Sequence, residues 1–142
     1  MHQIRRKYKI SYAHQLSSAY TKECFETIHG HTGVIEIFLS DMVLNKDGML
    51  IDFSSLDDIL GSVILKYDHA LLMPKSMDSD YLDMLSKHNK KLVLFDRSPT
   101  AEILAEHIFG EVRYIMKSFP NIEVDKVRFH ETEDGYAEYK IG

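Results

Sequence analysis

The order of apolar patterns along the chain predicts an α+β fold, with an antiparallel four-stranded sheet and helices on one face. Two strand patterns come first, at residues 3–11 and 32–41, and two come last, at 124–132 and 135–141. Between them, from residue 54 to about 118, most apolar residues have helical spacing. Strands that are segregated from helices in this way favour an antiparallel sheet.

Length and composition favour one domain over residues 1–142. The chain has 142 residues, of which 44% are hydrophobic and 27% charged, which is ordinary globular usage. Its net charge of −5 argues against a general nucleic-acid binder, which carries a basic patch. We find no membrane-spanning run and no leader-like apolar core, and the single cysteine cannot form an internal disulfide. We therefore expect a cytoplasmic protein.

The first strand is predicted at residues 3–11, which alternate with period two. One face of this strand carries a polar, mainly basic set: Gln3, Arg5, Lys7 and Lys9. Residues 12–28 show no periodicity and are expected to form a loop, and loops this long are usually functional or mobile. A second strand at 32–41 is rich in strand formers, and residues 45–48 are typical of a turn.

The first helix is expected to begin at Ser54 or Ser55, since either side chain can cap it. Apolar residues from 56 to 64 follow at helical spacing. Residues 79–88 favour a second, weaker helix.

Residues 91–95 form a short apolar run that is either a strand or a tether. Ser98 followed by Pro99 predicts the start of a longer helix that runs to about Ser118. The last two strands are joined by residues 133–135, which indicate a hairpin turn.

Three histidines are candidate metal ligands. His29 and His31 flank Gly30 at the start of the second strand, and residues i and i+2 of a strand face the same side. His14 ends the first strand, and a hairpin would bring it beside His29. Three imidazoles plus one open position are typical of a catalytic zinc site. The competing interpretation is chance: with eight histidines in the chain, roughly 0.4 His-x-His pairs are expected at random.

The remaining histidines are predicted to be surface or lightly packed side chains: His2, His88, His107 and His130.

Cys24 and the pair Asp68–His69 are candidates for moving protons. A cysteine near a metal ion has a lowered pKa, and its thiolate can act as a base or nucleophile. The alternative for Cys24 is that it is simply a small buried apolar residue. A carboxylate beside an imidazole can orient it and stabilise its charged form. The alternative for Asp68–His69 is a solvated turn at a helix exit.

Glu131 is a candidate ligand anchor. By alternation it shares a face with Val127 and Phe129, so its carboxylate points to the apolar side of the sheet. A buried carboxylate needs a partner, which is either an amino-pyrimidine edge of a ligand or a basic side chain.

Six motifs occur in one order along nearly the whole chain: Ser11–His14, His29–His31 with Cys24 upstream, Gly48–Phe53, Tyr67–His69, Pro99–Glu102 and His130–Thr132. In this order they resemble the 6-pyruvoyltetrahydropterin synthase family, which includes 6-carboxytetrahydropterin synthases of the queuosine pathway. The resemblance implies a tunnelling fold with a β-β-α-α-β-β subunit. It also implies trimers that close a β-barrel, and two trimers stacked as a homohexamer with active sites at subunit interfaces.

The resemblance implies Zn²⁺ on the three histidines and 7,8-dihydroneopterin triphosphate as a small-molecule substrate. It further implies that Glu131 and Thr100, at the helix start, bind the pterin ring of this substrate. Cys24 would move one proton, and the Asp68–His69 pair would relay another. The expected activity is that of a lyase that makes 6-carboxy-5,6,7,8-tetrahydropterin and releases acetaldehyde and triphosphate.

Three departures from the family pattern leave alternatives open. The spacing from Cys24 to His29 is longer than in the carboxytetrahydropterin branch and shorter than in the pyruvoyl branch. Glu26 resembles the glutamate that replaces the cysteine in a branch making 6-hydroxymethyl-dihydropterin for folate synthesis. Gly33 stands where many members have an aromatic residue. A pyruvoyl-forming synthase and a non-enzymatic module that binds zinc and pterin also stay open.

A triphosphate needs positive charge beyond the metal ion. Residues that can supply it are Arg5, Arg6, Lys7, Lys9 and Lys22, although a solvated strand face explains most of them equally.

Overall fold

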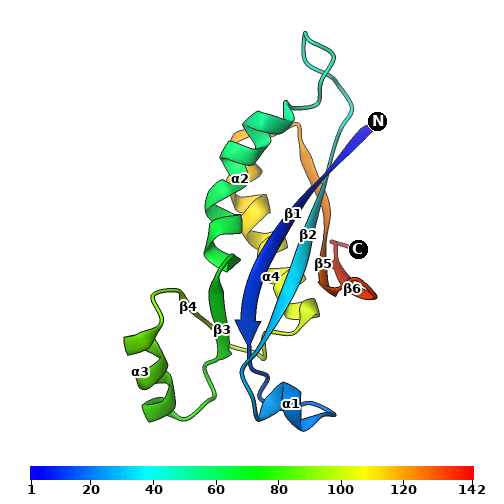
Figure 1. Cartoon of the computed structure of the whole chain (residues 1–142). Helices are drawn as coiled ribbons and strands as arrows, with labels where there is room; N and C mark the ends of the chain where they lie inside the picture. The colour runs from blue at the N-terminus through cyan, green and yellow to red at the C-terminus, as the bar shows by residue number, and fades with distance from the viewer.

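The computed structural model describes residues 1–142 as six strands and four α-helices around one curled sheet (Figure 1). The elements in chain order are β1 (His2–His14), α1 (Lys22–Phe25), β2 (His29–Asp41), α2 (Phe53–Tyr67), β3 (Ala70–Pro74), α3 (Ser79–His88), β4 (Leu92–Phe95), α4 (Ala101–Ile115), a 3₁₀ turn (Met116–Ser118), β5 (Glu123–Thr132) and β6 (Gly135–Tyr139). None of the helices has the length and apolar character needed to cross a membrane.

The predicted antiparallel sheet is present as β1, β2, β5 and β6, and two parallel strands extend it to six. The strand order is β4-β3-β1-β2-β5-β6, with β3 parallel to β1 and β4 parallel to β3. The run at 91–95 therefore contains a strand. The sequence pattern does not predict β3, because all five of its residues are buried and such a strand lacks alternation.

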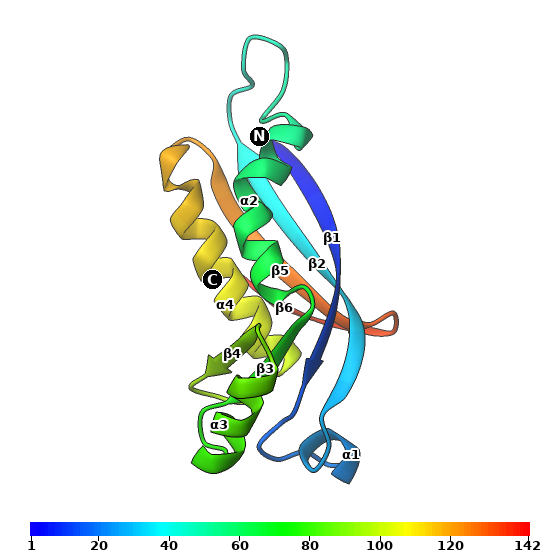
Figure 2. The same cartoon turned by 60° about the vertical axis from the view of Figure 1, so that its left-hand side comes forward.

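Helices α2 and α4 lie side by side on one face of the sheet, as predicted (Figure 2). Large side chains from both layers form the core, among them Ile10, Ile35, Ile37, Leu60, Leu104, Val127 and Phe129. Alternate residues of β1 and β2 thus point toward the helices. The same alternation continues through His14 on β1 and through His31 and His29 on β2.

Helix α3 forms where the weaker helix is predicted, but it packs on the opposite face. Its buried Leu85 contacts Leu71 and Met73 of β3, which alternate with the core residues Ala70 and Leu72. The expectation of helices on one face therefore holds for α2 and α4 and is wrong for α3. Figure 1 shows α3 beside β3 and β4 at the lower end of the sheet.

Both long helices are capped by residues other than the predicted ones. Asp52 caps α2, since its side chain accepts the backbone N–H groups of Ser54 and Ser55. Thr100, rather than Ser98, caps α4. Several cap-forming residues lie close together at each start, and local pattern alone does not choose among them.

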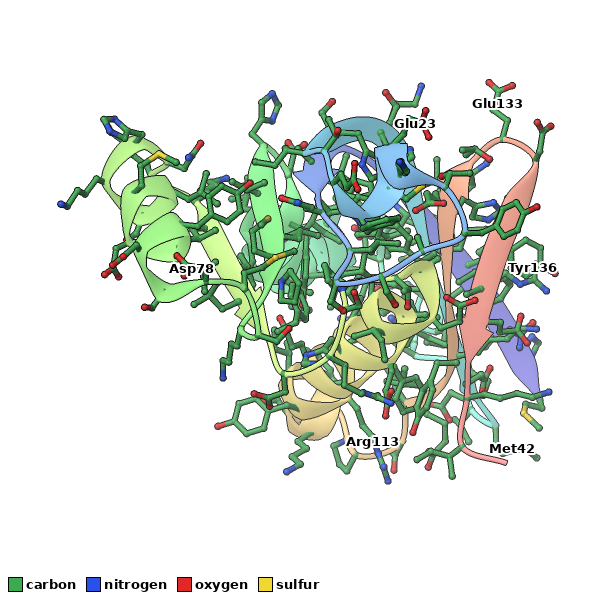
Figure 3. The ribbon with its side chains drawn as sticks, turned by 90° about the horizontal axis from the view of Figure 1, so that it is seen from below. Glu23, Met42, Asp78, Arg113, Glu133 and Tyr136 are labelled. Atoms are coloured by element: carbon green, nitrogen blue, oxygen red, sulfur yellow. The ribbon has the colours of Figure 1, made fainter.

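The loop predicted at 12–28 is shorter than expected. Tyr12–His14 belong to β1, because they pair with both β2 and β3. Helix α1 occupies part of the remainder, at the end of the molecule where α3 also lies. Viewed from that end, Glu23 of α1 and Glu133 of the β5–β6 turn lie toward one side, away from Asp78 at the start of α3 (Figure 3).

Candidate metal centre and ligand cavity

The three predicted histidines converge at the paired ends of β1 and β2. Antiparallel pairing sets His14 opposite His29 and Tyr12 opposite His31. The centroids of the three imidazole rings lie 4.5 to 5.0 Å apart. One ring nitrogen from each lies within 4.8 Å of the others, so the group can hold a metal ion.

The contacts of the histidine rings fit a metal ion. Nδ1 of His14 lies 2.9 Å from the Pro99 carbonyl oxygen, and Nδ1 of His29 lies 3.0 Å from that of Thr27. Backbone contacts of this kind orient metal-binding imidazoles and leave Nε2 free to coordinate. Nε2 of His14 and Nε2 of His31 are both buried and have no hydrogen-bond partner. Buried nitrogens without partners are rare, and these two are available to coordinate a metal ion.

The electrostatics of the site keep two of the rings neutral. Burial, helped by the neighbouring His29 and His31 and opposed by the contact with the Pro99 carbonyl, lowers the pKa of His14 to about 4. Burial also lowers the pKa of His31, with His29 acting in the same direction. Neutral imidazole is the form that binds metal ions.

Glu131 lies against this cluster, on the predicted face of β5. Its Oε1 is 3.4 Å from Nε2 of His14 and 3.6 Å from Nε2 of His31. The same residue lines a cavity of about 330 Å³ together with Thr100, at the start of α4, and with the β5–β6 hairpin. The structure thus brings both predicted substrate-binding residues to one cavity beside the histidines, with Thr100 also capping α4.

Cys24 and Glu26 lie at α1 and form no hydrogen bond or ion pair with the histidines. Cys24 is half-buried, and the Thr21 hydroxyl donates to its Sγ at 3.1 Å. Glu26 is exposed at the end of α1, where its backbone N–H donates to the carbonyl of Lys22. Neither residue is in contact with Asp68–His69.

Asp68 and His69 pair with each other as predicted, with Nδ1 of His69 3.1 Å from Oδ1 of Asp68. The Asp68 carboxylate also accepts the backbone N–H of Ser11. Burial by itself raises the pKa of Asp68, but the Ser11 N–H and His69 together hold it below its ordinary value. His69 is 78% exposed, has a positive φ of 58°, and lines a second cavity with Ser11, Tyr12 and Ala13. Neither Asp68 nor His69 forms a hydrogen bond or ion pair with His14, His29 or His31.

The other face of the sheet holds a polar cluster that sequence reasoning missed. Glu36 of β2 is buried, and its carboxylate contacts Nε2 of His130 and the guanidinium of Arg5. Burial opposes ionisation of Glu36, but His130, Arg5 and Arg128 hold its pKa below the ordinary value. His130 is therefore a paired, half-buried residue, which corrects the prediction of a lightly packed surface histidine.

Two of the basic residues expected to favour a triphosphate are engaged elsewhere. Arg5 pairs with Glu36, and Arg6 forms a bidentate contact with Asp57 of α2. The Tyr8 hydroxyl donates to the same carboxylate at 2.8 Å. These contacts tie β1 to its neighbours and lie outside the site.

Tyr12 lies at the histidine site, and sequence reasoning gave it no role there. Its ring also explains why position 33 is a glycine. A Cβ atom at Gly33 would lie 2.9 Å from Cε1 of Tyr12, closer than real Cβ contacts allow. The Tyr12 ring therefore fills the space beside Gly33. Gly33 pairs with Ile10, two residues before Tyr12 on the same face of β1, so the strand register was the signal that could have found this contact.

Comparisons with known proteins agree with this architecture. Residues 3–141 match the family model described as 6-pyruvoyl tetrahydropterin synthase. The chain is 29% identical to the 6-carboxy-5,6,7,8-tetrahydropterin synthase of Haemophilus influenzae, over 99% of each chain. It is 28% identical to the synthase of that name from Helicobacter pylori strain J99, over 95% of this chain and 70% of the relative.

Solved structures share the fold. The Caenorhabditis elegans 6-pyruvoyl tetrahydropterin synthase superposes with a TM-score of 0.71 at 24% identity, covering 99% of this chain and 95% of that one. An uncharacterized protein of Wolinella succinogenes superposes with a TM-score of 0.77 at 18% identity, covering 99% and 98%. With its fold, its histidine cluster and a family match along nearly its whole length, the chain belongs to the 6-pyruvoyl tetrahydropterin synthase family.

Proposed function

We propose that this chain is a zinc-dependent lyase that converts 7,8-dihydroneopterin triphosphate into 6-carboxy-5,6,7,8-tetrahydropterin, with release of acetaldehyde and triphosphate. The observation that supports this most directly is the set of unpartnered histidine nitrogens beside Glu131 and its cavity. The relatives named above carry the name of this synthase. The product would enter 7-deazaguanine (queuosine) biosynthesis.

His14, His29 and His31 would hold the zinc ion. Three imidazoles suit Zn²⁺ and leave one coordination position for a substrate or water. Zinc supplies a Lewis acid that polarises oxygen atoms of a bound substrate. The backbone contacts of His14 and His29 fix the ring orientations before any ion arrives.

Glu131 would bind the pterin ring. Its carboxylate has two acceptor oxygens, which match the adjacent N–H donors of an amino-pyrimidine edge. Because its side chain is 37% exposed beside the cavity, a ligand can reach it without unfolding β5.

Cys24 and the Asp68–His69 pair would move protons. The Thr21 hydroxyl donates a hydrogen bond to the Cys24 sulfur and so fixes its position on α1. The carboxylate of Asp68 orients the His69 ring and stabilises it when protonated.

We infer that the protein assembles from several copies, as trimers and stacked hexamers. In this chain β1 pairs with β3 only through Tyr12–His14, so most of one β1 edge is unpaired, and β6 pairs only with β5. Unpaired strand edges are templates for another chain. A neighbouring copy would bring its own Asp68–His69 toward the histidines of this one.

Product analysis tests the proposal. Zinc-loaded protein is incubated with 7,8-dihydroneopterin triphosphate, and the products are identified by mass spectrometry. The 6-carboxy product with acetaldehyde is expected. A 6-hydroxymethyl product would indicate the folate branch, and a 6-pyruvoyl product the tetrahydrobiopterin branch. Zinc and pterin binding without turnover would leave a binding module.

A second test decides between Cys24 and Glu26 as the base. Cys24→Ala should lower kcat by about 10² to 10⁴-fold, the usual contribution of a general base. Glu26→Ala serves as the matched control on the same short helix and should leave kcat nearly unchanged. Both variants should keep their zinc. If only Glu26→Ala abolishes turnover, the assignment to the carboxy branch is wrong.

A further inference from the structure

Tyr12 carries a buried hydroxyl that has no partner. The residue is 4% exposed, and its hydroxyl forms no hydrogen bond. Its ring meets His14 edge-on at 5.3 Å, lies tilted against His31 at 5.5 Å and meets Phe129 edge-on at 5.4 Å. Buried hydroxyls are nearly always hydrogen-bonded, so this one indicates a partner that arrives when the site is filled.

Gly33 permits this position of the ring. A Cβ atom there would lie 2.9 Å from Cε1 of Tyr12, 3.2 Å from the His130 carbonyl oxygen and 3.3 Å from Cζ of Phe129. The Tyr12 ring therefore lies over Gly33 of β2 and against Phe129 of β5, two residues before Glu131.

Glu131 is the acceptor best placed to become the partner. Its Oε1 faces Nε2 of His14 and Nε2 of His31, and these are the two imidazoles that Tyr12 packs against. No hydrogen bond within the chain holds this carboxylate, and its side chain is partly exposed, so it can turn. A metal ion on the histidine nitrogens would compete with Glu131 for them.

We propose that Tyr12 is a positioning residue: its hydroxyl donates a hydrogen bond to the Glu131 carboxylate when the histidines hold a metal ion. This contact fixes the carboxylate at the cavity, where it meets the ligand. The inference rests on the proposed function in one respect, namely that Glu131 binds a pterin.

A double-mutant cycle tests the coupling. In zinc-loaded protein, Tyr12→Phe should weaken the binding of neopterin, followed by its fluorescence, by about tenfold, as expected for one hydrogen bond to a charged group. Zinc content should not change, and the melting temperature should be unchanged or higher, because the unpaired hydroxyl is removed. In a Glu131→Ala background the same substitution should change affinity by less than about twofold, because the partner is absent.

Two further variants serve as comparisons. Tyr8→Phe removes a hydroxyl from the same strand and face, but one that is bonded to Asp57. It should lower the melting temperature and leave neopterin affinity unchanged. Gly33→Ala should displace the Tyr12 ring and weaken both stability and neopterin binding.

Two results would overturn the proposal: wild-type neopterin affinity in Tyr12→Phe, or an equal loss with and without Glu131. A crystal structure of the zinc-loaded protein gives a readout that needs no pterin. A distance below about 3.2 Å between the Tyr12 hydroxyl and the Glu131 carboxylate supports the contact, and one beyond about 4 Å overturns it. The distance decides this inference even if product analysis shows that the proposed reaction does not occur.

Discussion

The ligand-binding half of the candidate site and its proton-moving half differ in how they are built. His14, His29 and His31 come from the ends of two strands whose register is fixed along thirteen residue pairs. Cys24 lies on a four-residue helix, and Asp68–His69 lie beyond the end of α2, in contact with the backbone of Ser11 in β1.

This contrast has a physical cause. Strand pairing positions side chains through many backbone hydrogen bonds, so a single chain can build a metal centre there. The position of a short helix or of a helix end depends instead on the side chains that pack against it. One chain therefore brings the three histidines together, and under the proposed function a neighbouring copy would supply the Asp68–His69 pair.

The largest expected effect comes from removing a ligand in the binding half. His31→Ala should lower zinc affinity by more than about 100-fold, beyond the loss typical of residues that only support a metal ligand. Turnover should be lost with the zinc, as measured by elemental analysis and product formation. His2→Ala, at the exposed start of β1, is the control and should keep both. A His31→Ala protein that retains one zinc per chain would contradict the assignment of this centre.

Mixed oligomers test the division between the two halves. Chains with His31→Ala and chains with His69→Ala are each expected to be inactive alone. Co-expressed, they should regain about a quarter of wild-type activity, because random pairing puts intact histidines beside an intact His69 in that share of interfaces. Co-expression of His31→Ala with His29→Ala should restore nothing, because both changes lie in the same half. If the first pair also stays inactive, each chain contributes its own Asp68–His69.

Smaller effects are expected from substituting the two glutamates that lie on opposite faces of the sheet, Glu36 and Glu131. Glu36 is buried and paired with His130 and Arg5, so Glu36→Gln should lower the free energy of unfolding at pH 7 by about 1 to 3 kcal/mol. Glu131→Gln should weaken pterin binding and leave the melting temperature almost unchanged.

The pH dependence of stability gives an independent check on Glu36. Its pKa in the folded protein is held below the ordinary value of 4.5, so the unfolded chain binds protons first as the pH falls. Its contribution is therefore complete above about pH 4.5 and is lost as the pH falls through the folded pKa. Urea unfolding across this range should be less pH-dependent in Glu36→Gln than in the wild type. Equal slopes for the two proteins would show that Glu36 is not stabilised as an anion.

Local patterns predicted the parts of the molecule that depend on neighbours in sequence. Period-two alternation predicted β1, strand-forming residues predicted β2, and the hairpin turn at 133–135 predicted β5 and β6. Alternation also placed Glu131 on the helix-facing side with Phe129. Spacing of i and i+2 put His29 and His31 on one side, and a hairpin then required His14 beside them. The weaker helix expected at residues 79–88 is present as α3 with the same bounds.

The sequence by itself determined the α+β class, the antiparallel sheet and the choice of the three histidines as candidate metal ligands. Strand and helix periodicity can be recognised within a short stretch of consecutive residues. Only the tertiary structure decided where separate elements meet. It paired β3 with β1, turned α3 to the opposite face, set Tyr12 over Gly33 and buried Glu36 beside His130. Each of these contacts joins residues from different elements or strands, so packing and hydrogen bonding between them, rather than any local pattern, selects the arrangement.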